Sequence, residues 1–179
     1  MMSNILKLDL QSCVGCEACA NVCPRNAISM KPDERGFLCP SISDDCINCG
    51  KCVTVCQRLS SSFDMINKDG SVFYAAKNMD ADERKTSKSG GVFIELAKSF
   101  IKNDGIVYGV ILDSNRHVHH TRASTLEEIK HFKGSKYVQS TIGNTFQDIK
   151  KDLGGVHRFC FPEPPVNVKV CGGILNQSQ

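Results

Sequence analysis

The segment Cys13-Val-Gly-Cys-Glu-Ala-Cys-Ala-Asn-Val-Cys23 recurs 33 residues later as Cys46-Ile-Asn-Cys-Gly-Lys-Cys-Val-Thr-Val-Cys56. Both segments have the spacing C-x2-C-x2-C-x3-C, so they are two copies of one unit and not a single irregular set of cysteines. This repeat holds eight of the eleven cysteines in the chain of 179 residues. Of the other three, Cys39 lies between the two copies, and Cys160 and Cys171 follow much later.

The spacing within each copy favours iron–sulfur clusters of the 4Fe–4S type. A cubane cluster has four iron corners, and each corner needs one thiolate. Three cysteines spaced two residues apart let a short loop supply three ligands, and in two-cluster proteins the fourth cysteine of the run ligates the other cluster. Small residues in the loops (Gly15, Ala18 and Gly50) let backbone N–H groups approach the cluster sulfides. The expected ligands are Cys13, Cys16, Cys19 and Cys56 for cluster I, and Cys46, Cys49, Cys52 and Cys23 for cluster II.

Zinc and disulfides are the alternatives for a cysteine-rich segment. Structural zinc sites use four cysteines in paired C-x2-C groups, but they do not require a third cysteine at the same spacing and a fourth at x3. A disulfide scaffold needs export and an oxidising compartment. The N-terminal residues Met1–Leu10 carry Lys7 and Asp9 and lack the apolar stretch of a signal peptide. We therefore expect metal clusters in a cytoplasmic protein.

The bulk composition excludes several other classes of protein. The net charge of +3 is too small and too scattered to indicate nucleic acid or a membrane surface as partner. The longest nearly unbroken apolar run, Gly105 to Leu112, is far shorter than the roughly 20 residues of a membrane-spanning helix. We expect no nucleic-acid binding and no membrane insertion.

After the cysteine-rich part, residues 1–62, the pattern changes. Residues 63–70 are expected to form a linker that ends in an Asp-Gly turn. From residue 71 to about 155, strands and helices alternate, which predicts an α/β domain. The expected strands are 72–76, 105–112 and 117–122, and the expected helices are about 90–102, 125–130 and 141–153. The fold class of the whole chain is therefore predicted as α+β.

Residues 5 to 60 resemble a bacterial-type two-cluster ferredoxin, which implies two short helices and small hairpins. Residues 27–30 and 36–40 would form the hairpin between the motifs. Pro24 follows Cys23 as in that family, whereas Gln57 stands where the second proline would be, which alters the backbone and not the ligand count. Residues 1–62 carry six acidic and six basic side chains. A neutral module favours a redox partner within the same chain over steering toward many separate partners.

Four strings in the second part are similar to the β subunit of coenzyme F-420 hydrogenase/dehydrogenase: Ser87–Gly91, Gly105–Gly109, His119-His120 and Phe132–Ser140. This resemblance implies a flavin-binding domain that passes electrons between a reduced deazaflavin or related donor, FAD and the clusters. It also implies a redox partner protein or subunit. An oxidoreductase activity is expected only if the flavin domain is complete, and the sequence assigns no catalytic residue.

Under this resemblance, the candidate flavin contacts are Ser87, Ser89, Gly90, Gly91, Lys133, Gly134, Ser135 and Lys136. The first four could cradle a phosphate at a helix start or simply form a helix cap with a glycine turn, and the lysines could hold phosphate or face water. His117, His119 and His120 lack a neighbouring carboxylate or cysteine, so we expect no zinc site there. Cys39 is expected to act as a small apolar residue rather than a ligand.

The end of the sequence departs from this pattern. Pro162, Pro164 and Pro165 fall where the alternation calls for the next buried strand. If the codons from Arg158 onward are read in another frame, they can encode a Gly-Thr-Pro-Cys-Gln string, which is similar to a signature after the third helix in the F-420 family. We therefore expect residues 156–179 to be an aberrant, disordered tail caused by truncation or a frameshift. Flavin would then bind weakly or not at all, and the alternative function is a stand-alone ferredoxin-like carrier or an inactive fragment.

Overall fold

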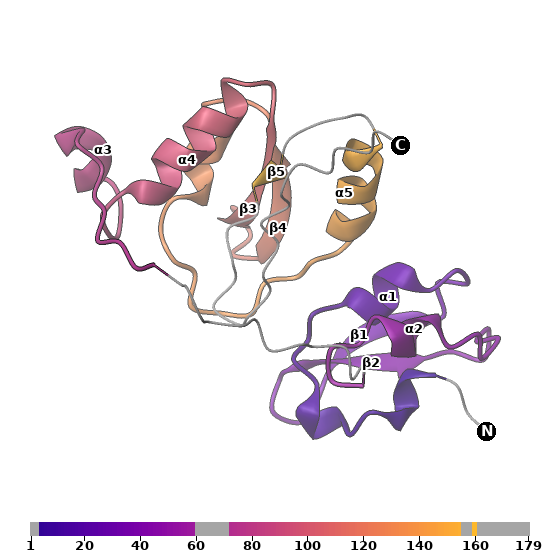
Figure 1. Cartoon of the computed structure of the whole chain (residues 1–179). Coiled ribbons are helices and arrows are strands. Elements are labelled where there is room, and N and C mark those ends of the chain that lie inside the picture. The colour runs from indigo at the N-terminus through magenta and orange to yellow at the C-terminus, as the bar shows by residue number, and fades with distance from the viewer. Residues whose placement is uncertain (1–3, 60–71, 155–158, 161–179) are drawn as a thin grey trace. The chain divides into compact units, whose positions relative to one another are not determined.

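A computed structural model describes residues 4–59, 72–154 and 159–160 (Figure 1). The chain divides into two compact units: Met1–Ser71 with Ile142–Phe146, and Val72–Thr141 with Gln147–Gln179. About 32% of the described residues are helical and 17% are in strands, so the predicted α+β class is confirmed. The expected linker, residues 63–70, lies outside the described residues. So does the expected tail, except for residues 159–160.

The first unit consists of short helices around one hairpin. Its elements are η1 (Ile5–Lys7), η2 (Leu10–Ser12), α1 (Ala18–Val22), β1 (Ile28–Pro32), β2 (Leu38–Ile42) and α2 (Lys51–Thr54). Strands β1 and β2 pair antiparallel, which confirms the predicted hairpin between the motifs. Its turn is closed by Asp33, whose carboxylate accepts the backbone N–H groups of Arg35 and Phe37, and by Gly36 at φ +87°.

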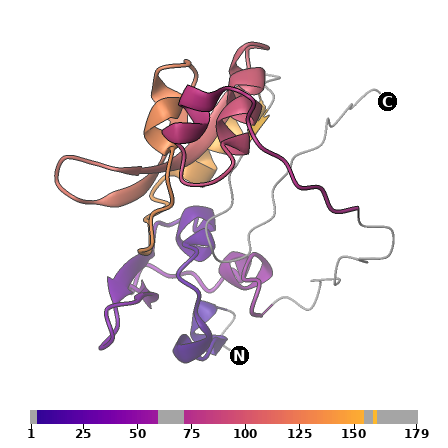
Figure 2. The ribbon, with the colours of Figure 1, turned by 90° about the vertical axis from the view of Figure 1, so that its left-hand side faces the viewer.

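The sequence repeat is visible in the backbone of this unit. Helix α2 begins 33 residues after α1, in step with the cysteines. Each helix follows a loop with two residues in the left-handed region: Gly15 and Glu17 before α1, and Asn48 and Gly50 before α2. The two helices contact each other, and both views of the ribbon place them side by side (Figure 2). The two cysteine motifs therefore fold as matching loop–helix segments.

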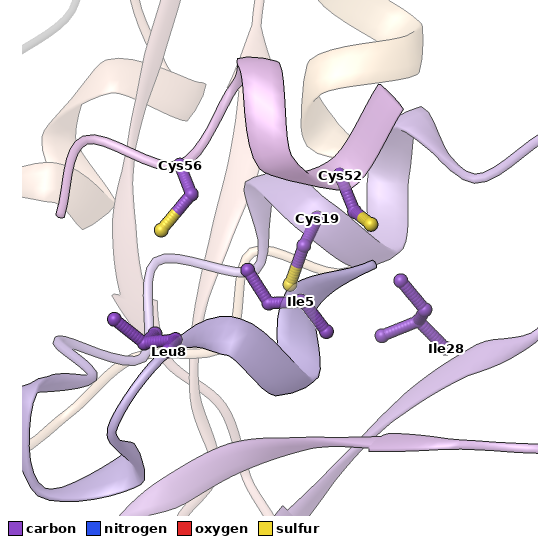
Figure 3. Packing of buried hydrophobic residues seen from close by; sticks show 6 residues of the cluster. All are labelled: Ile5, Leu8, Cys19, Ile28, Cys52 and Cys56. Carbon is purple, nitrogen blue, oxygen red and sulfur yellow. The ribbon is translucent and has the colours of Figure 1, made fainter. Parts of the chain in front are cut away.

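Half of the buried residues that form the core of the first unit are cysteines. The cluster consists of Ile5, Leu8, Cys19, Ile28, Cys52 and Cys56 (Figure 3). In Figure 3 the sulfur of Cys52 points toward the side of Ile28, while the sulfurs of Cys19 and Cys56 lie on the side of Ile5 and Leu8. Ile5 of η1 is 1% exposed and belongs to this core. A domain this small has few apolar side chains of its own, and bound clusters can supply the missing core.

The second unit is built on a three-stranded sheet in the order β4-β3-β5. Strand β3 (Ile106–Leu112) pairs antiparallel with β4 (Val118–Ala123) and parallel with the short β5 (Phe159–Cys160). The other elements are α3 (Ala81–Lys85), α4 (Val92–Ile101), η3 (Glu128–Phe132) and α5 (Thr145–Leu153), of which α5 begins within the segment assigned to the first unit. The two described residues of the tail that was expected to be disordered thus form an edge strand.

Alternation along β3 explains how helices cover this sheet. Val107 and Ile111 pack with Ile94 and Ala97 of α4 and with η3. Tyr108 points the other way and donates a hydrogen bond of 2.5 Å to Asp152 of α5. Figure 1 accordingly shows α4 and α5 on opposite sides of the strands. Gly109 faces Phe132, and an added Cβ would lie 2.4 Å from its ring, so only glycine fits there.

Several predicted elements are found as expected, and three need correction. The helix predicted at 90–102 and the strands predicted at 105–112 and 117–122 are α4, β3 and β4. The strand predicted at 72–76 is absent, and Phe73 is 92% exposed, because β-propensity without a pairing strand does not fix a strand. The helix predicted at 125–130 is the 3-10 helix η3, and the helix predicted at 141–153 begins only at Thr145, after Gly143 at φ +55°.

The described helices are all short. None of them, within residues 4–59 and 72–154, is long and apolar enough to cross a membrane.

Candidate iron–sulfur site

A pocket in the first unit is lined by four cysteines that come from both motifs. They are Cys13, Cys16 and Cys19 of the first motif and Cys56 of the second. These are the four residues that the crossed-ligand rule predicts for cluster I. Most of the remaining lining is apolar, and Glu17 and Arg58 are its charged members. Four thiols in an apolar pocket fit a 4Fe–4S cluster, since its irons take thiolate ligands and its potential depends on exclusion of water.

The local structure explains why these four cysteines meet. Cys13 caps the end of η2, and its N–H donates to the carbonyl of Leu10 at 3.0 Å. Cys16 lies in the loop with two left-handed residues, and Cys19 is the second residue of α1. Cys56 follows directly after the turn that ends α2. Because α1 and α2 pack together, the end of the second motif reaches the pocket of the first.

Backbone N–H groups point at several of the cysteine sulfurs. The N–H of Gly15 lies 3.5 Å from Cys13 Sγ, and the N–H of Ala27 lies 3.3 Å from Cys23 Sγ. Such bonds stabilise negative charge on sulfur, so they favour the thiolate that binds iron and help set the cluster potential.

The thiols of the pocket are hard to ionise when no metal is bound. Burial, and after it the neighbouring sulfur of Cys16, raises the pKa of Cys19 to about 12. Burial also raises the pKa values of Cys13 and Cys16, and each of these thiols feels the charge of Cys56 as well. Metal binding must therefore displace protons from these cysteines.

The second predicted set is less completely assembled. Burial raises the pKa of Cys52, the N–H of Ile5 lowers it, and the sulfur of Cys46 is near enough to raise it. Cys49 is exposed, and Cys23 interacts with the N–H of Ala27. The assignment of Cys46, Cys49, Cys52 and Cys23 to one cluster therefore rests on the repeat spacing.

The described part of the chain offers no site for a single metal ion. Within it, no three side chains of His, Cys, Asp or Glu converge as ligands of one ion would. A cubane cluster needs a different arrangement, because each cysteine sulfur binds a different iron. The four cysteine sulfurs therefore surround the whole cluster and do not converge on one ion. The nine cysteines from Cys13 to Cys56 are all free thiols, so none of them forms a disulfide.

Cys39 contacts the site although it lies outside both motifs. It is buried on β2, and its sulfur lies 3.8 Å from the carbonyl oxygen of Leu10, which also accepts the N–H of Cys13. Its sulfur also raises the pKa of Cys13, though less than burial does. Cys39 thus packs beside Cys13 and is buried, whereas a small, half-buried apolar residue was expected.

His117 and His120, two of the three clustered histidines, have different surroundings. His120 is buried, its Nδ1 lies 3.0 Å from Ser140 Oγ, and burial lowers its pKa. The side chain of His117 is 78% exposed beside Asp113. Among the described residues, no group of three metal-ligating side chains forms around these histidines.

The candidate flavin contacts lie in two segments, 87–91 and 133–136, and the structure brings these segments together. Lys133 Nζ donates to Glu83 Oε2 at 3.0 Å and to the hydroxyl of Thr86, and Gly134 lies beside Lys88. Lys136 Nζ donates to three backbone carbonyls at the end of η3, those of His131, Phe132 and Lys133. Both lysines therefore have partners within the protein.

The segment 87–91 before α4 forms a helix cap with a glycine turn, which is the alternative to a phosphate-binding loop. Gly91 is the N-cap of α4 at φ +73°, with no side-chain cap, and Ser87 donates its hydroxyl to the carbonyl of Glu83 at 2.8 Å. Gly90 lies against the backbone of Ala76, where an added Cβ would be 2.8 Å from the carbonyl oxygen. Ser89 and Ser135 are exposed. Backbone packing thus accounts for both glycines.

Sequence reasoning missed one charged residue of the pocket. Glu17 is buried, and its carboxylate accepts the N–H of Ile142 at 2.9 Å and the N–H of Gly143 at 3.1 Å. Residues 125 positions apart leave no local signal for such a contact. The only available sign was that the repeat has glycine, Gly50, at the equivalent position.

Comparison with known proteins agrees with this site. Residues 12–58 match the family of the 4Fe–4S dicluster domain. No curated protein matches the chain. The matched segment spans both cysteine motifs, and it supports iron–sulfur clusters as the cofactor and electron transfer as the role of this part of the chain.

Proposed function

We propose that the chain relays single electrons through two 4Fe–4S clusters held by the crossed ligand sets. Cluster I would be bound by Cys13, Cys16, Cys19 and Cys56, and cluster II by Cys46, Cys49, Cys52 and Cys23. The pocket lined by the first four cysteines carries this proposal, because it joins ligands from both motifs as the spacing rule requires. When bound, such clusters accept and release one electron at a time.

The protein's own residues would set the conditions for this transfer. Ile5 and Leu8 exclude water from the pocket, and the N–H groups of Gly15 and Ala27 stabilise charge on the ligand sulfurs. Four thiolate ligands in an apolar surrounding favour a low potential, on the order of −400 mV as in low-potential ferredoxins. Redox titration followed by EPR would measure it, and a potential above zero would exclude this part of the proposal.

The wider context that we propose is a component related to the β subunit of coenzyme F-420 hydrogenase/dehydrogenase. Electrons would then pass between a flavin or deazaflavin donor, the clusters and a redox partner protein. The four similar strings of the second part support this proposal, as does the neutral charge of residues 1–62.

The alternative is a carrier that holds clusters but no flavin. The contacts of Lys133 and Lys136 favour it, since both ammonium groups are already bound to protein atoms and would have to leave them to reach a phosphate. Flavin content after reconstitution with FAD separates the two functions. Stoichiometric, tightly bound FAD would support the flavin enzyme, and purification without FAD would support the carrier.

Metal and sulfide analysis tests the proposal most simply. Protein purified without oxygen should contain about eight irons and eight acid-labile sulfides, the content of two four-iron clusters. About one zinc per four cysteines, with no sulfide, would exclude iron–sulfur clusters.

A further inference from the structure

Glu17 occupies a position where the repeat otherwise has glycine. It corresponds to Gly50, and each of the two residues directly precedes a helix. The backbone of both lies in the left-handed region, at φ +57° for Glu17 and φ +78° for Gly50. Glycine adopts this conformation without strain, whereas a residue with a Cβ does so at a cost. A strained glutamate that persists at such a position indicates that its side chain has a role.

That role is not to cap helix α1. Glu17 makes no side-chain hydrogen bond to the first turn of the helix. Its carboxylate instead binds the backbone N–H groups of Ile142 and Gly143, one to each oxygen. Asn21, one turn further along α1, donates from Nδ2 to the carbonyl of Gly143 at 2.9 Å. The two side chains thus bind two backbone N–H groups and one backbone carbonyl of the same short turn.

This turn belongs to the first unit. The segment Ile142–Phe146 clusters with residues 1–71, although it comes much later in the chain. Ile142 and Thr145 are buried, and Thr145 donates its hydroxyl to the carbonyl of Ile142. The segment is therefore a built part of the unit that holds the cysteine motifs.

Glu17 also lines the pocket of the four cysteines. It directly follows Cys16 in the sequence, lies two residues before Cys19, and is only 7% exposed. A negative charge beside a site that accepts an electron opposes reduction, and the effect is larger where water is excluded.

We propose that Glu17 is a positioning residue. It fixes the segment Ile142–Phe146 against the first cysteine motif, and its charge lowers the potential of the cluster bound at this pocket. The effect on the potential rests on the proposed function, whereas the fixing of Ile142–Phe146 does not. The asymmetry between Glu17 and Gly50 then makes the two clusters different, although their ligand sets are equivalent.

Two substitutions separate the effects of the side chain. Glu17→Gly copies the second motif, so it relieves the backbone strain but removes the carboxylate. Glu17→Gln keeps the size and one acceptor oxygen but removes the charge. Asn26→Gly is the matched control, because Asn26 is an exposed residue of the same unit at φ +50°. It relieves similar strain without touching residues 142–146.

Hydrogen exchange tests the clamp. The peptide that contains Ile142 and Gly143 should exchange roughly tenfold faster or more in Glu17→Gly, since two hydrogen bonds are lost. In Glu17→Gln the increase should be smaller, and in Asn26→Gly there should be none. Amides of the β1–β2 hairpin serve as the internal reference. Unchanged exchange at 142–143 in Glu17→Gly would overturn the clamp, and if that variant fails to fold, the same comparison is made with Glu17→Gln.

The cluster potential tests the role of the charge. Both Glu17 variants should raise the midpoint potential of cluster I and leave that of cluster II unchanged, while Asn26→Gly alters neither. Equal potentials in Glu17→Gln and the natural protein would overturn this part. Absence of clusters from the natural protein would contradict the proposed function, and the exchange experiment would still decide the clamp.

Discussion

Cys56, which ends the second cysteine motif, lines the same pocket as Cys13, which begins the first. The two residues are 43 positions apart and come together because helices α1 and α2 pack against each other. The first motif alone therefore supplies only three of the four cysteines that line this pocket. The fourth thiol of the pocket depends on the fold of the whole unit.

Cys39 should be dispensable for cluster binding. Its sulfur packs behind Cys13 and against the carbonyl of Leu10, and it does not line the pocket. Cys39→Ala should keep about eight irons per chain, whereas Cys13→Ala should lose the irons of cluster I. Iron and sulfide analysis of both variants, purified without oxygen, measures this. Loss of four irons in Cys39→Ala would show that Cys39 is a ligand.

Gly109→Ala should destabilise the second unit. The added Cβ would lie 2.4 Å from the buried ring of Phe132, which sits between the sheet and α4. We expect a loss of about 1 to 3 kcal/mol in the free energy of unfolding, as for other overpacked cores. Urea unfolding followed by circular dichroism measures it.

A double-mutant cycle gives the control for this prediction. Adding Phe132→Leu should recover part of the loss in Gly109→Ala, because the smaller side chain leaves room for the methyl group. If the two substitutions were strictly additive, the clash with Phe132 would not be the cause.

Glu83→Gln should weaken the second unit at neutral pH and less so in acid. The hydrogen bond from Lys133, and then that from Lys98, hold the pKa of Glu83 below its usual value. A carboxylate with a lowered pKa in the folded state stabilises the fold above its unfolded pKa of about 4.3, and this contribution is lost as the pH falls through the folded pKa. We expect the free energy of unfolding of Glu83→Gln to be roughly 1 kcal/mol lower than that of the natural protein at pH 7, and this difference should become smaller below about pH 4.

The matched control for Glu83 is Glu127→Gln. Glu127 pairs with Lys130, and both side chains are mostly exposed, at 77% and 54%. Solvent screens such a pair, so this variant should change the stability little at any pH. If Glu83→Gln lowered the free energy of unfolding by the same amount at every pH, the charge of Glu83 would not contribute to the stability.

The reading frame after Arg158 can be checked directly on the coding DNA. We expect that another frame encodes the Gly-Thr-Pro-Cys-Gln string beyond this point. Sequencing across the junction decides the matter, and an alternative frame without that string would contradict the prediction. Apart from Phe159 and Cys160 in β5, the residues concerned lie outside the described part of the chain.

The sequence predicted those features that depend on local chemistry. The resemblance of residues 5 to 60 to a two-cluster ferredoxin implied two short helices and a hairpin between the motifs, and these are α1, α2 and β1–β2. Apolar spacing indicated α4. In each case the signal and the structure lie within one short stretch of chain.

The features that the sequence missed depend on distant partners. Residues 72–76 have the composition of a strand but no strand beside them, so Phe73 is exposed. The hydrogen bond that Glu17 accepts from the N–H of Ile142 and the ion pair between Lys133 and Glu83 join segments far apart in sequence. No pattern in a single sequence gives the positions of such partners.

The crossed assignment of the fourth ligand is the central claim, and EPR of two single variants tests it. Cys56→Ser should disturb the signal of cluster I, held mainly by the first motif, and Cys23→Ser should disturb that of cluster II. Cys16→Ser and Cys49→Ser, which lie in the loops themselves, identify the two signals. The account predicts that Cys56→Ser resembles Cys16→Ser, and Cys23→Ser resembles Cys49→Ser. The reverse pairing would contradict it.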